Sequence, residues 1–492
     1  MRQVWPIVMS ALCVAGCSTT PPIAVSPQVS GGWVNGPAGA SAAVPADEDW
    51  WRRLGDPVVD QLVAAALIDN PTLGEALARV DQARAGSQIA GAARAPRADV
   101  TGSATYGEQN LGQAGASAIE ATSATLSPRL TWEIDLWGRV RQTAAAARSR
   151  LDARTADAQA VRLSVSAQIA SGVLRLRACD YSLRVRGADI ASRRTELDLM
   201  QVRLSLGNAA PVEVATARTN LAAAETDRAA QGEQCAREIN ALAALSGVGA
   251  AEIRAALPQA GESEPWVSGV GVSIADVIPE APPIRPVLPA VVLLSHPGVA
   301  AAEREMQARW AEIDVARADR LPRIDLAAVL TGQWIDAMGE ATNFTTWSVG
   351  PQLSGVLFDG GAGAASVRNA DARYREAVAT LEGEVRAAIQ GVEDGLAAAH
   401  SADERFATSL EAVDAARLAL EANEARWRVG AGTQFEREES RRLYSRAQES
   451  LIAAARDRSL AWIELVRASG NSFDIGGAPM AAGRSHSTLI VQ

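Results

Sequence analysis

Residues 126–138 read Leu-Ser-Pro-Arg-Leu-Thr-Trp-Glu-Ile-Asp-Leu-Trp-Gly, and this stretch contains the pattern that decides the fold. As far as Leu136, apolar residues alternate with polar or charged ones, which is the period of a β-strand with one apolar face. After Gly138 the alternation stops. Residues 139–206 are rich in Ala, Arg, Glu and Asp, and we expect them to form one helix on the order of 100 Å long. The sequence therefore predicts a strand that leads directly into an unusually long helix.

The same order of patterns occurs twice in the chain. The aligned landmarks are Asn70 with His296 at an offset of 226, Gly138 with Gly360 at 222, and Gly207 with Gly430 at 223. Three nearly equal offsets in the same order indicate one ancestral unit that was copied. Each unit is expected to contain a helix, a strand, an outer loop, a second strand, a long helix and a return helix.

The element boundaries follow from the patterns in the two copies. The expected ranges are first helices 72–94 and 298–320; strands 98–106 and 126–136, then 324–330 and 347–357; outer loops 107–122 and 335–345; long helices 139–206 and 361–428; and return helices 211–246 and 434–469. Both long helices repeat apolar residues every seven positions, from Ile169 to Leu204 and from Val378 to Trp427. An offset of 223 places the first series on the second, so the copies share one packing register, which is typical of supercoiled helices.

The strands favour a membrane sheet over a soluble β-sandwich, although both would alternate in this way. Aromatic residues, which suit a lipid–water boundary, flank the strands. They are Tyr106, Trp132, Trp137, Trp334 and Trp347. No run of eighteen apolar residues is present, so a membrane span has to be made of strands.

The two copies supply only four strands, whereas closed membrane barrels begin at about eight. Because an open edge in lipid leaves backbone groups unpaired, several chains must complete one barrel. Two chains would give eight strands and three would give twelve. The same closure would place the long helices in a ring around a water-filled lumen.

The first residues resemble a bacterial lipoprotein signal. A short positive start and an apolar stretch precede Val14-Ala15-Gly16-Cys17, and the polar residues from Ser18 to Pro22 follow. In that interpretation Cys17 is acylated and becomes the mature N-terminus, and Ser18 is, by resemblance, the version sent to the outer membrane. The alternative is an ordinary secretory signal with a chance cysteine.

The composition argues against several classes of protein. The net charge of −10 and the absence of a basic run exclude a nucleic-acid partner. Three histidines and four cysteines leave almost no material for a metal or catalytic site. We therefore expect no cofactor, no metal ion and no enzymatic activity. A periplasmic adaptor would carry one helical hairpin and no amphipathic strand pairs, and a cytosolic coiled-coil scaffold would lack the signal.

Two cysteines remain after Cys13 and Cys17 are assigned to the signal and the lipid. Cys179 precedes Gly207 and Cys235 follows it, both at the same spacing along the chain. An antiparallel hairpin that turns at Gly207 would place them level with each other, and the periplasm is oxidising. A disulfide is the interpretation we favour; the alternative is two unrelated buried thiols.

Several motifs resemble the TolC-like outer-membrane efflux family, in its lipoprotein branch that works with RND-type pumps. The matching segments are Trp50-Trp51 with Leu54-Gly55-Asp56-Pro57, then Asn70-Pro71, Trp132 to Gly138, Leu357-Phe358-Asp359-Gly360-Gly361, and Leu288 to Pro297. The last segment departs from the family, because His296-Pro297-Gly298 stands where Arg-Pro-Asp is usual. The resemblance covers nearly all of the chain after Cys17.

The resemblance implies a fold that is mainly α with membrane β. A homotrimer would form a twelve-stranded β-barrel continuing into a long periplasmic α-helical barrel, lipid-anchored in the outer membrane. It would dock to a periplasmic adaptor and an inner-membrane RND-type pump, and would conduct small molecules passively to the exterior. The alternative is the duct of another export system, such as type I secretion or metal efflux.

The expected domain organisation follows the duplication. The parts are a signal peptide at 1–16, a lipid-anchored tether and outer segment at 17–66, repeat 1 at 67–247, a Pro-rich inter-repeat segment at 248–290, repeat 2 at 291–470, and a flexible C-terminal tail at 471–492.

The family resemblance also implies a gate at the helix tips, where acidic side chains after the tip glycine narrow the lumen. Carried onto this sequence, the gate residues are Glu436 and Glu439 after Gly430, and Glu213 after Gly207, with Arg437 among them. A threefold ring of such carboxylates would favour cations. The alternative is that Glu436, Glu438 and Arg441 form ordinary surface pairs three and four residues apart on one helix.

Overall fold

The computed structural model describes residues 32–36, 49–109, 119–257, 278–283, 289–337 and 339–471. Contacts divide the chain into two compact units. The strand unit includes Ala78–Thr155 and Ala301–Gly383, and the helical unit includes Gln28–Leu77, Ala156–Ala300 and Glu384–Gln492. Residues 1–31, with Cys17 and the expected signal peptide, lie outside the described residues, as do residues 472–492.

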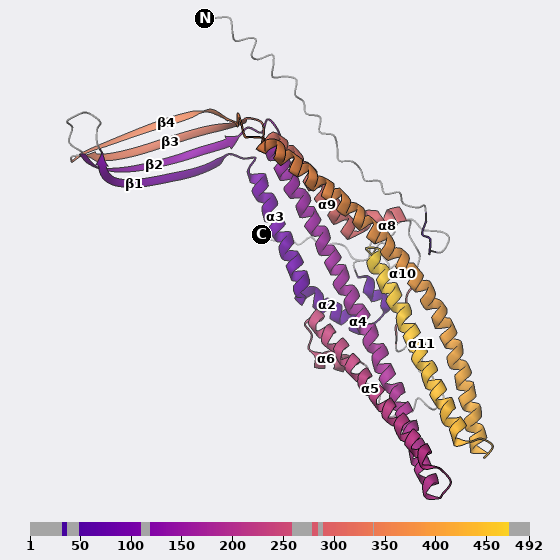
Figure 1. Ribbon diagram of the computed structural model, residues 1–492. Coiled ribbons are helices and arrows are strands. Elements are labelled where there is room, and N and C mark those ends of the chain that lie inside the picture. The colour runs from indigo at the N-terminus through magenta and orange to yellow at the C-terminus, as the bar shows by residue number, and fades with distance from the viewer. Residues whose placement is uncertain are drawn as a thin grey trace, which may run out of the picture. The chain divides into compact units, whose positions relative to one another are not determined.

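Four long strands form one antiparallel sheet in the strand unit (Figure 1). They are β1 (Arg97–Gln109), β2 (Ile119–Glu133), β3 (Arg323–Ala337) and β4 (Glu340–Ser354), and they pair in the order β1-β2-β3-β4. The hairpins of the two copies join through β2 and β3, where Leu126 lies opposite Gly332. Each copy therefore contributes one hairpin to a single sheet, and β1 and β4 are its edge strands.

The strands extend further into the predicted outer loops than the sequence indicated. Residues 107–109 and 119–122 pair across the first hairpin, and 335–337 and 340–345 pair across the second, so the predictions of loops at 107–122 and 335–345 were wrong over these residues. These extensions are rich in Ala, Thr and acidic residues and lack an apolar alternation. Backbone hydrogen bonds, which leave no mark on the side-chain pattern, hold them in the sheet.

Two aspartates lie between the strands and the long helices that follow them. The strand predictions of 126–136 and 347–357 ran too far, since β2 stops at Glu133 and β4 at Ser354. The carboxylate of Asp135 accepts hydrogen bonds from the backbone N–H groups of Val140 (3.1 Å) and Arg141 (2.9 Å), which are unpaired donors of the first turn of the helix. Asp359 does the same in the second copy, and these backbone hydrogen bonds hold the pKa of its carboxyl below its usual value.

The two faces of the sheet differ in chemistry. One face exposes large apolar side chains, of which Trp347 is 76% exposed. Other exposed apolar side chains on this face are Val100, Leu126, Leu130, Trp132, Leu330 and Val349. The opposite face carries hydroxyl groups, and Ser127 Oγ donates to Thr331 Oγ1 across the strand pair at 3.1 Å. A sheet with one apolar and one hydroxyl-bearing face can contact lipid on one side and water on the other.

The helices repeat in the same order in the two copies. The first copy has α3 (Pro71–Ala92), α4 (Arg139–Ser205) and α5 (Pro211–Ser246); the second has α9 (Pro297–Ala318), α10 (Ala362–Arg428) and α11 (Gln434–Ala468). The predicted long and return helices are confirmed within one residue at each end. None of the helices in the described part of the chain combines the length and the apolar character needed to cross a bilayer.

The seven-residue series lies on the buried side of the long helices. Ile169, Leu176 and Ile190 of α4 are buried, as are Val385, Val392 and Leu420 of α10. The series fails at its last member, because Trp427 is 41% exposed.

The core of the helical unit gathers around two tryptophans. Trp50, in the short 3-10 helix η1 (Trp50–Leu54), packs against Trp462 of α11 with ring centroids 5.7 Å apart, and its indole N–H donates to Ser166 Oγ at 3.2 Å. Asp56 caps α2 (Pro57–Asp69) and forms a bidentate ion pair with Arg177 of α4 at 2.5 and 2.8 Å. Residues 50–56 are thereby fixed to both repeats.

Little of the inter-repeat segment lies within the described residues. Within it, α6 (Ala250–Ala256) buries Ile253, and Ile278 is buried as well. The short α8 (Pro289–Ser295) then leads into repeat 2.

Candidate functional site at the helix tips

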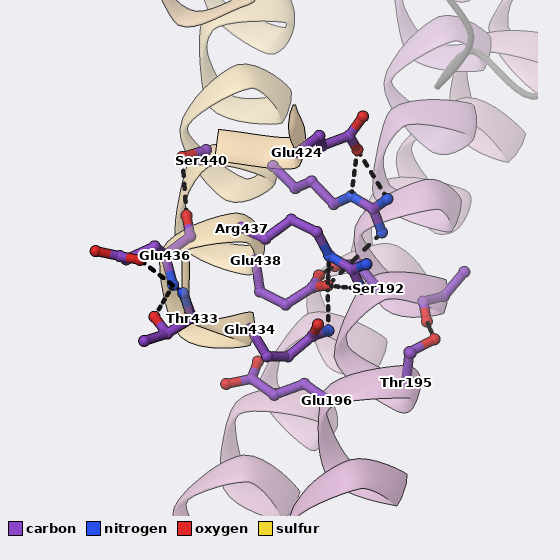
Figure 2. Close-up of polar contacts among 12 residues, drawn as sticks. Ser192, Thr195, Glu196, Glu424, Thr433, Gln434, Glu436, Arg437, Glu438 and Ser440 are labelled. Atoms are coloured by element: carbon purple, nitrogen blue, oxygen red, sulfur yellow. Dashed lines mark hydrogen bonds and ion pairs between the residues drawn. The ribbon is translucent and has the colours of Figure 1, made fainter. Parts of the chain in front are cut away.

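Two of the three predicted gate carboxylates act as caps of the return helices. At the start of α11 the backbone N–H of Thr433 donates to Glu436 at 2.8 Å, and the N–H of Glu436 donates to Thr433 Oγ1 at 3.1 Å (Figure 2). At the start of α5 the N–H of Ala210 donates to Glu213 at 2.7 Å. The hydrogen bonds from Thr433 hold the pKa of the Glu436 carboxyl below its ordinary value. Glu213 is exposed and Glu436 half exposed in the single chain, and each reaches back to its own helix end.

Arg437, the predicted cation of the gate, is buried between the two helices of the second hairpin. Its guanidinium lies 3.8 Å from the centroid of the Trp427 ring, which is a cation–π distance. The same guanidinium donates to Glu438 at 2.9 and 3.2 Å. Arg437 therefore fastens the end of α10 to the start of α11.

Glu438 is the most enclosed charged group of the tip, with no exposed surface. Its carboxylate accepts hydrogen bonds from Arg437, from Gln434 Nε2 at 2.8 Å and from the hydroxyl of Ser192 on α4, as Figure 2 shows. Arg441 lies 3.6 Å away and also pairs with Glu424 of α10 at 2.9 Å. Because the acceptor is a charged carboxylate, these hydrogen bonds are strong. The bond from Ser192 joins α11 to α4, and Arg441 links the same cluster to α10 through Glu424.

A second link between α11 and α4 lies one turn further along. Arg442 donates to Glu196 of α4 at 2.7 Å and pairs with Glu439 at 2.9 Å. Although burial of Arg442 favours its neutral form, the hydrogen bonds to Glu439 and Glu196 raise its pKa. Glu439, the third predicted gate carboxylate, is thus about half exposed and pairs with Arg442.

The first turns of α11 have their polarity inverted. Phe435 and Leu443 are exposed at 60% and 51%, while charged and polar side chains point inward. The inward set is Arg437, Glu438, Ser440 and Arg442. An interface made of ion pairs can separate and be hydrated without exposing apolar surface, so this arrangement suits a contact that opens and closes.

Sequence reasoning found the tip but missed the residues that hold it. Glu438 and Arg441 appeared only as members of surface pairs on one helix, and Ser192, Glu196 and Arg442 did not appear at all. The one available signal was that residues 434–443 contain only two apolar residues, Phe435 and Leu443, among charged and polar ones.

The two remaining cysteines lie side by side between α4 and α5. Their sulfur atoms are 2.03 Å apart and their Cα atoms 5.6 Å apart, within the range of a disulfide. The lipidation residue Cys17 lies outside the described residues. Among the residues described, no three His, Cys, Asp or Glu side chains come together in a way that could hold a metal ion.

A sheet with an exposed apolar face, joined to paired long helices whose tips are held by ion pairs, defines the class of TolC-like outer-membrane channels. The outer membrane efflux protein family matches residues 62–248 and 288–471, and the protein belongs to this family. Its two matched segments correspond to the two copies of the helix, hairpin and long-helix unit.

Known proteins of this type are similar along nearly the whole chain. The chain is 27% identical over 470 residues to the pyoverdine export outer membrane protein OpmQ of Pseudomonas putida, covering 94% of this chain and 96% of that one. It is 28% identical over 483 residues to the toluene efflux pump outer membrane protein TtgC of Pseudomonas putida, covering 96% of each. The crystal structure of the outer membrane protein VceC from Vibrio cholerae has the same fold, with a TM-score of 0.70 at 24% identity, over 87% of this chain and all of that one. The relatives are outer-membrane components of export and efflux systems, and this protein is an outer-membrane channel of that family.

Proposed function

We propose that the protein is the outer-membrane duct of a tripartite efflux system, in which three copies close one conduit. The observation that carries this proposal is the two-faced four-stranded sheet. Its edge strands β1 and β4 have no second partner in the described chain, and unpaired backbone groups are costly in lipid. Three copies supply twelve strands, with the apolar face toward lipid and the hydroxyl-bearing face toward water.

The relatives support a proposal for the partners and the cargo. A periplasmic adaptor and an inner-membrane RND-type pump would deliver small molecules to the periplasmic end, and the duct would conduct them passively without catalysing a reaction. The names of the relatives, which refer to pyoverdine export and toluene efflux, support small-molecule cargo over secreted protein. Acylation of Cys17 would add a lipid anchor in the outer membrane.

The gate would lie at the helix tips and depend on the contact between α11 and α4. In the closed state, Glu438 holds Ser192 and Arg442 holds Glu196. Opening would part these pairs and let water solvate them. The capping carboxylates Glu213 and Glu436, with Glu439, would then contribute a threefold acidic ring that favours cations in the lumen.

Channel recordings test this function. Detergent extraction of outer membranes should yield an oligomer that dissociates on heating and conducts ions across a planar bilayer, with a reversal potential that indicates cation preference. A protein that stays monomeric after extraction, or an intact oligomer without conductance, would contradict the proposal. Neutralising Glu436 and Glu439 together without a change in reversal potential would reject the acidic ring alone.

A further inference from the structure

The disulfide lies well away from the tip of the first hairpin. Cys179 is in the middle third of α4, which ends at Ser205, and Cys235 is in the second half of α5, which begins at Pro211. At the helical rise of 1.5 Å per residue, the bond is about 40 Å from the tip. Both cysteines are buried, and they belong to the large apolar core of the helical unit.

Between the tip and the disulfide, no side chain of α5 is fully buried. From Arg218 to Gln234 every side chain of α5 is exposed or half exposed, whereas Val214 and Ala217 are buried near the tip and Ile239 and Leu242 beyond the disulfide. Cys235 is therefore the first buried residue of α5 after this stretch. The apolar contacts of the first hairpin fall into two separate groups, one at each end of it.

Polar contacts join α4 and α5 in this stretch. Arg194 pairs with Glu225 at 2.7 Å, with both side chains well exposed, and Arg193 donates to the carbonyl oxygen of Asn220 at 3.5 Å. Exposed pairs of this kind contribute little to stability because water competes for both partners.

A polar cavity of about 210 Å³ lies beside the same stretch, between α4, α5 and α11. Charged side chains line it from all three helices: Arg186, Asp189 and Arg193 from α4, Asp227 from α5, and Arg442 and Glu449 from α11. Its size and polarity are sufficient for several waters. The polar joint is the name used below for α5 residues 218–234 together with Arg186, Asp189, Arg193 and Arg194 of α4.

We propose that the Cys179–Cys235 bond is a staple that confines the parting of α4 and α5 to the polar joint, which makes closure of the duct dependent on an oxidised disulfide. The proposal rests on the proposed channel function. Water can enter the joint at little cost, and α5 has no fully buried apolar residue between Ala217 and Cys235. With the bond intact, the tip residues linked through Glu438 and Arg442 move as one body, and α4 and α5 keep their register beyond the disulfide. With the bond broken, parting extends upward into the apolar core.

The redox step involves only this bond. A dithiol reductant passes two electrons and two protons to the disulfide, so that Cys179 and Cys235 become thiols and the reductant becomes its own disulfide. In the cell the reductant would be a dithiol, or two monothiols acting in turn and forming a disulfide with each other, that enters the periplasm.

The experiment uses the full-length oligomer and two independent readouts. Dithiothreitol should increase several-fold the frequency of leak openings in a planar bilayer. It should also speed amide hydrogen exchange at 218–234 and extend that exchange to Ile239 and Leu242. The double variant Cys179→Ser/Cys235→Ser should behave as the reduced protein from the start and should not respond to the reductant. Arg194→Gln, which breaks an ion pair in the joint but spares the bond, should change neither readout appreciably.

The possible failures can be told apart. If mass spectrometry without reductant finds two free thiols, no staple exists and the inference is overturned. If the wild type is shown to be reduced and both leak and exchange stay unchanged, the staple does not confine the joint. If the oxidised oligomer does not conduct at all, the channel function fails, while the exchange measurement still decides whether the bond limits the joint.

Discussion

The enclosed carboxylate of Glu438 allows a direct test of how the tips are held. The change is Glu438→Gln, which keeps the shape of the side chain and removes its charge. Glu438 has no exposed surface, and its carboxylate pairs with Arg437 at 2.9 Å and lies 3.6 Å from Arg441. Removal of one partner from a buried charged pair costs about 3–5 kcal/mol, because the remaining charges are left uncompensated. We expect the free energy of unfolding of the tip region to fall by an amount of that order.

Only part of this lost free energy favours separation of α11 from α4. The pairs with Arg437 and Arg441 lie within the second hairpin and persist when α11 parts from α4, whereas the hydrogen bond from Ser192 is broken in that step. A hydrogen bond to a charged group contributes roughly 1.5–3 kcal/mol. The glutamine oxygen still accepts from Ser192, at the roughly 0.5–1.5 kcal/mol of a neutral hydrogen bond, so about 1–1.5 kcal/mol is lost. Since every 1.4 kcal/mol is tenfold in an equilibrium, the balance between closed and parted tips should shift about five- to tenfold per chain.

The assay is single-channel recording in planar bilayers, together with the entry of a large antibiotic into intact cells. Glu436→Gln is the matched control, because Glu436 lies two residues earlier on the same helix, is half exposed and caps that helix. Ser192→Ala should reproduce the opening effect and spare the contacts within α11. If Glu438→Gln leaves the leak unchanged in a properly assembled oligomer while Glu436→Gln increases it, lumen-facing carboxylates control the gate and the reasoning from burial is refuted.

Four further outcomes are expected. Cys179→Ser/Cys235→Ser, which opens the 56-residue loop that the disulfide closes, should lower the free energy of unfolding by about 4 kcal/mol on the chain-entropy relation. The midpoint temperature of unfolding should fall accordingly, and a reductant should not lower it further in this variant. Trp427→Leu should remove the cation–π contact with the Arg437 guanidinium and lower the free energy of unfolding, measured by denaturant titration, by about 1–2 kcal/mol. An unchanged unfolding transition would show that the ring only shields the guanidinium from water. Burial raises the pKa of Glu449 above its ordinary value of 4.5, so its contribution to stability should be full below pH 4.5 and lost as the pH rises through the raised pKa. Glu449→Gln should abolish this pH dependence of thermal unfolding. An identical pH profile in the variant would exclude Glu449 as its source. Cys17→Ser should abolish lipidation, seen by mass spectrometry, and retention of an acyl group would reject the anchor.

The repeats were predictable because each signal was local and strong. Offsets between copies record the duplication, and the period-two strands and the seven-residue repeat reflect which side of an element meets water. The disulfide pair was predictable as well, because helices fix distance along the chain: equal spacing on both sides of Gly207 places Cys179 and Cys235 at one depth.

The candidate site was predictable only in its position. Glu436, Glu439 and Glu213 were chosen because they follow the tip glycines, and two of them turn out to cap their helices. Glu438 could not be recognised, because adjacent glutamates at 438 and 439 look alike in sequence. Only the packing of α11 against α4 makes one of them enclosed and the other half exposed.

The sequence by itself determined the elements, their duplication and their amphipathic faces, since those depend on residues a few positions apart. The tertiary structure decided how far the strands run, since backbone pairing extends them through residues with no side-chain pattern. It also decided which charges are buried at the tip, because burial depends on contacts between residues such as Ser192 and Glu438, which are 246 positions apart. An ion pair changes from a weak surface contact into a strong link only when neighbouring helices exclude water from it, and no local pattern in the chain records that exclusion.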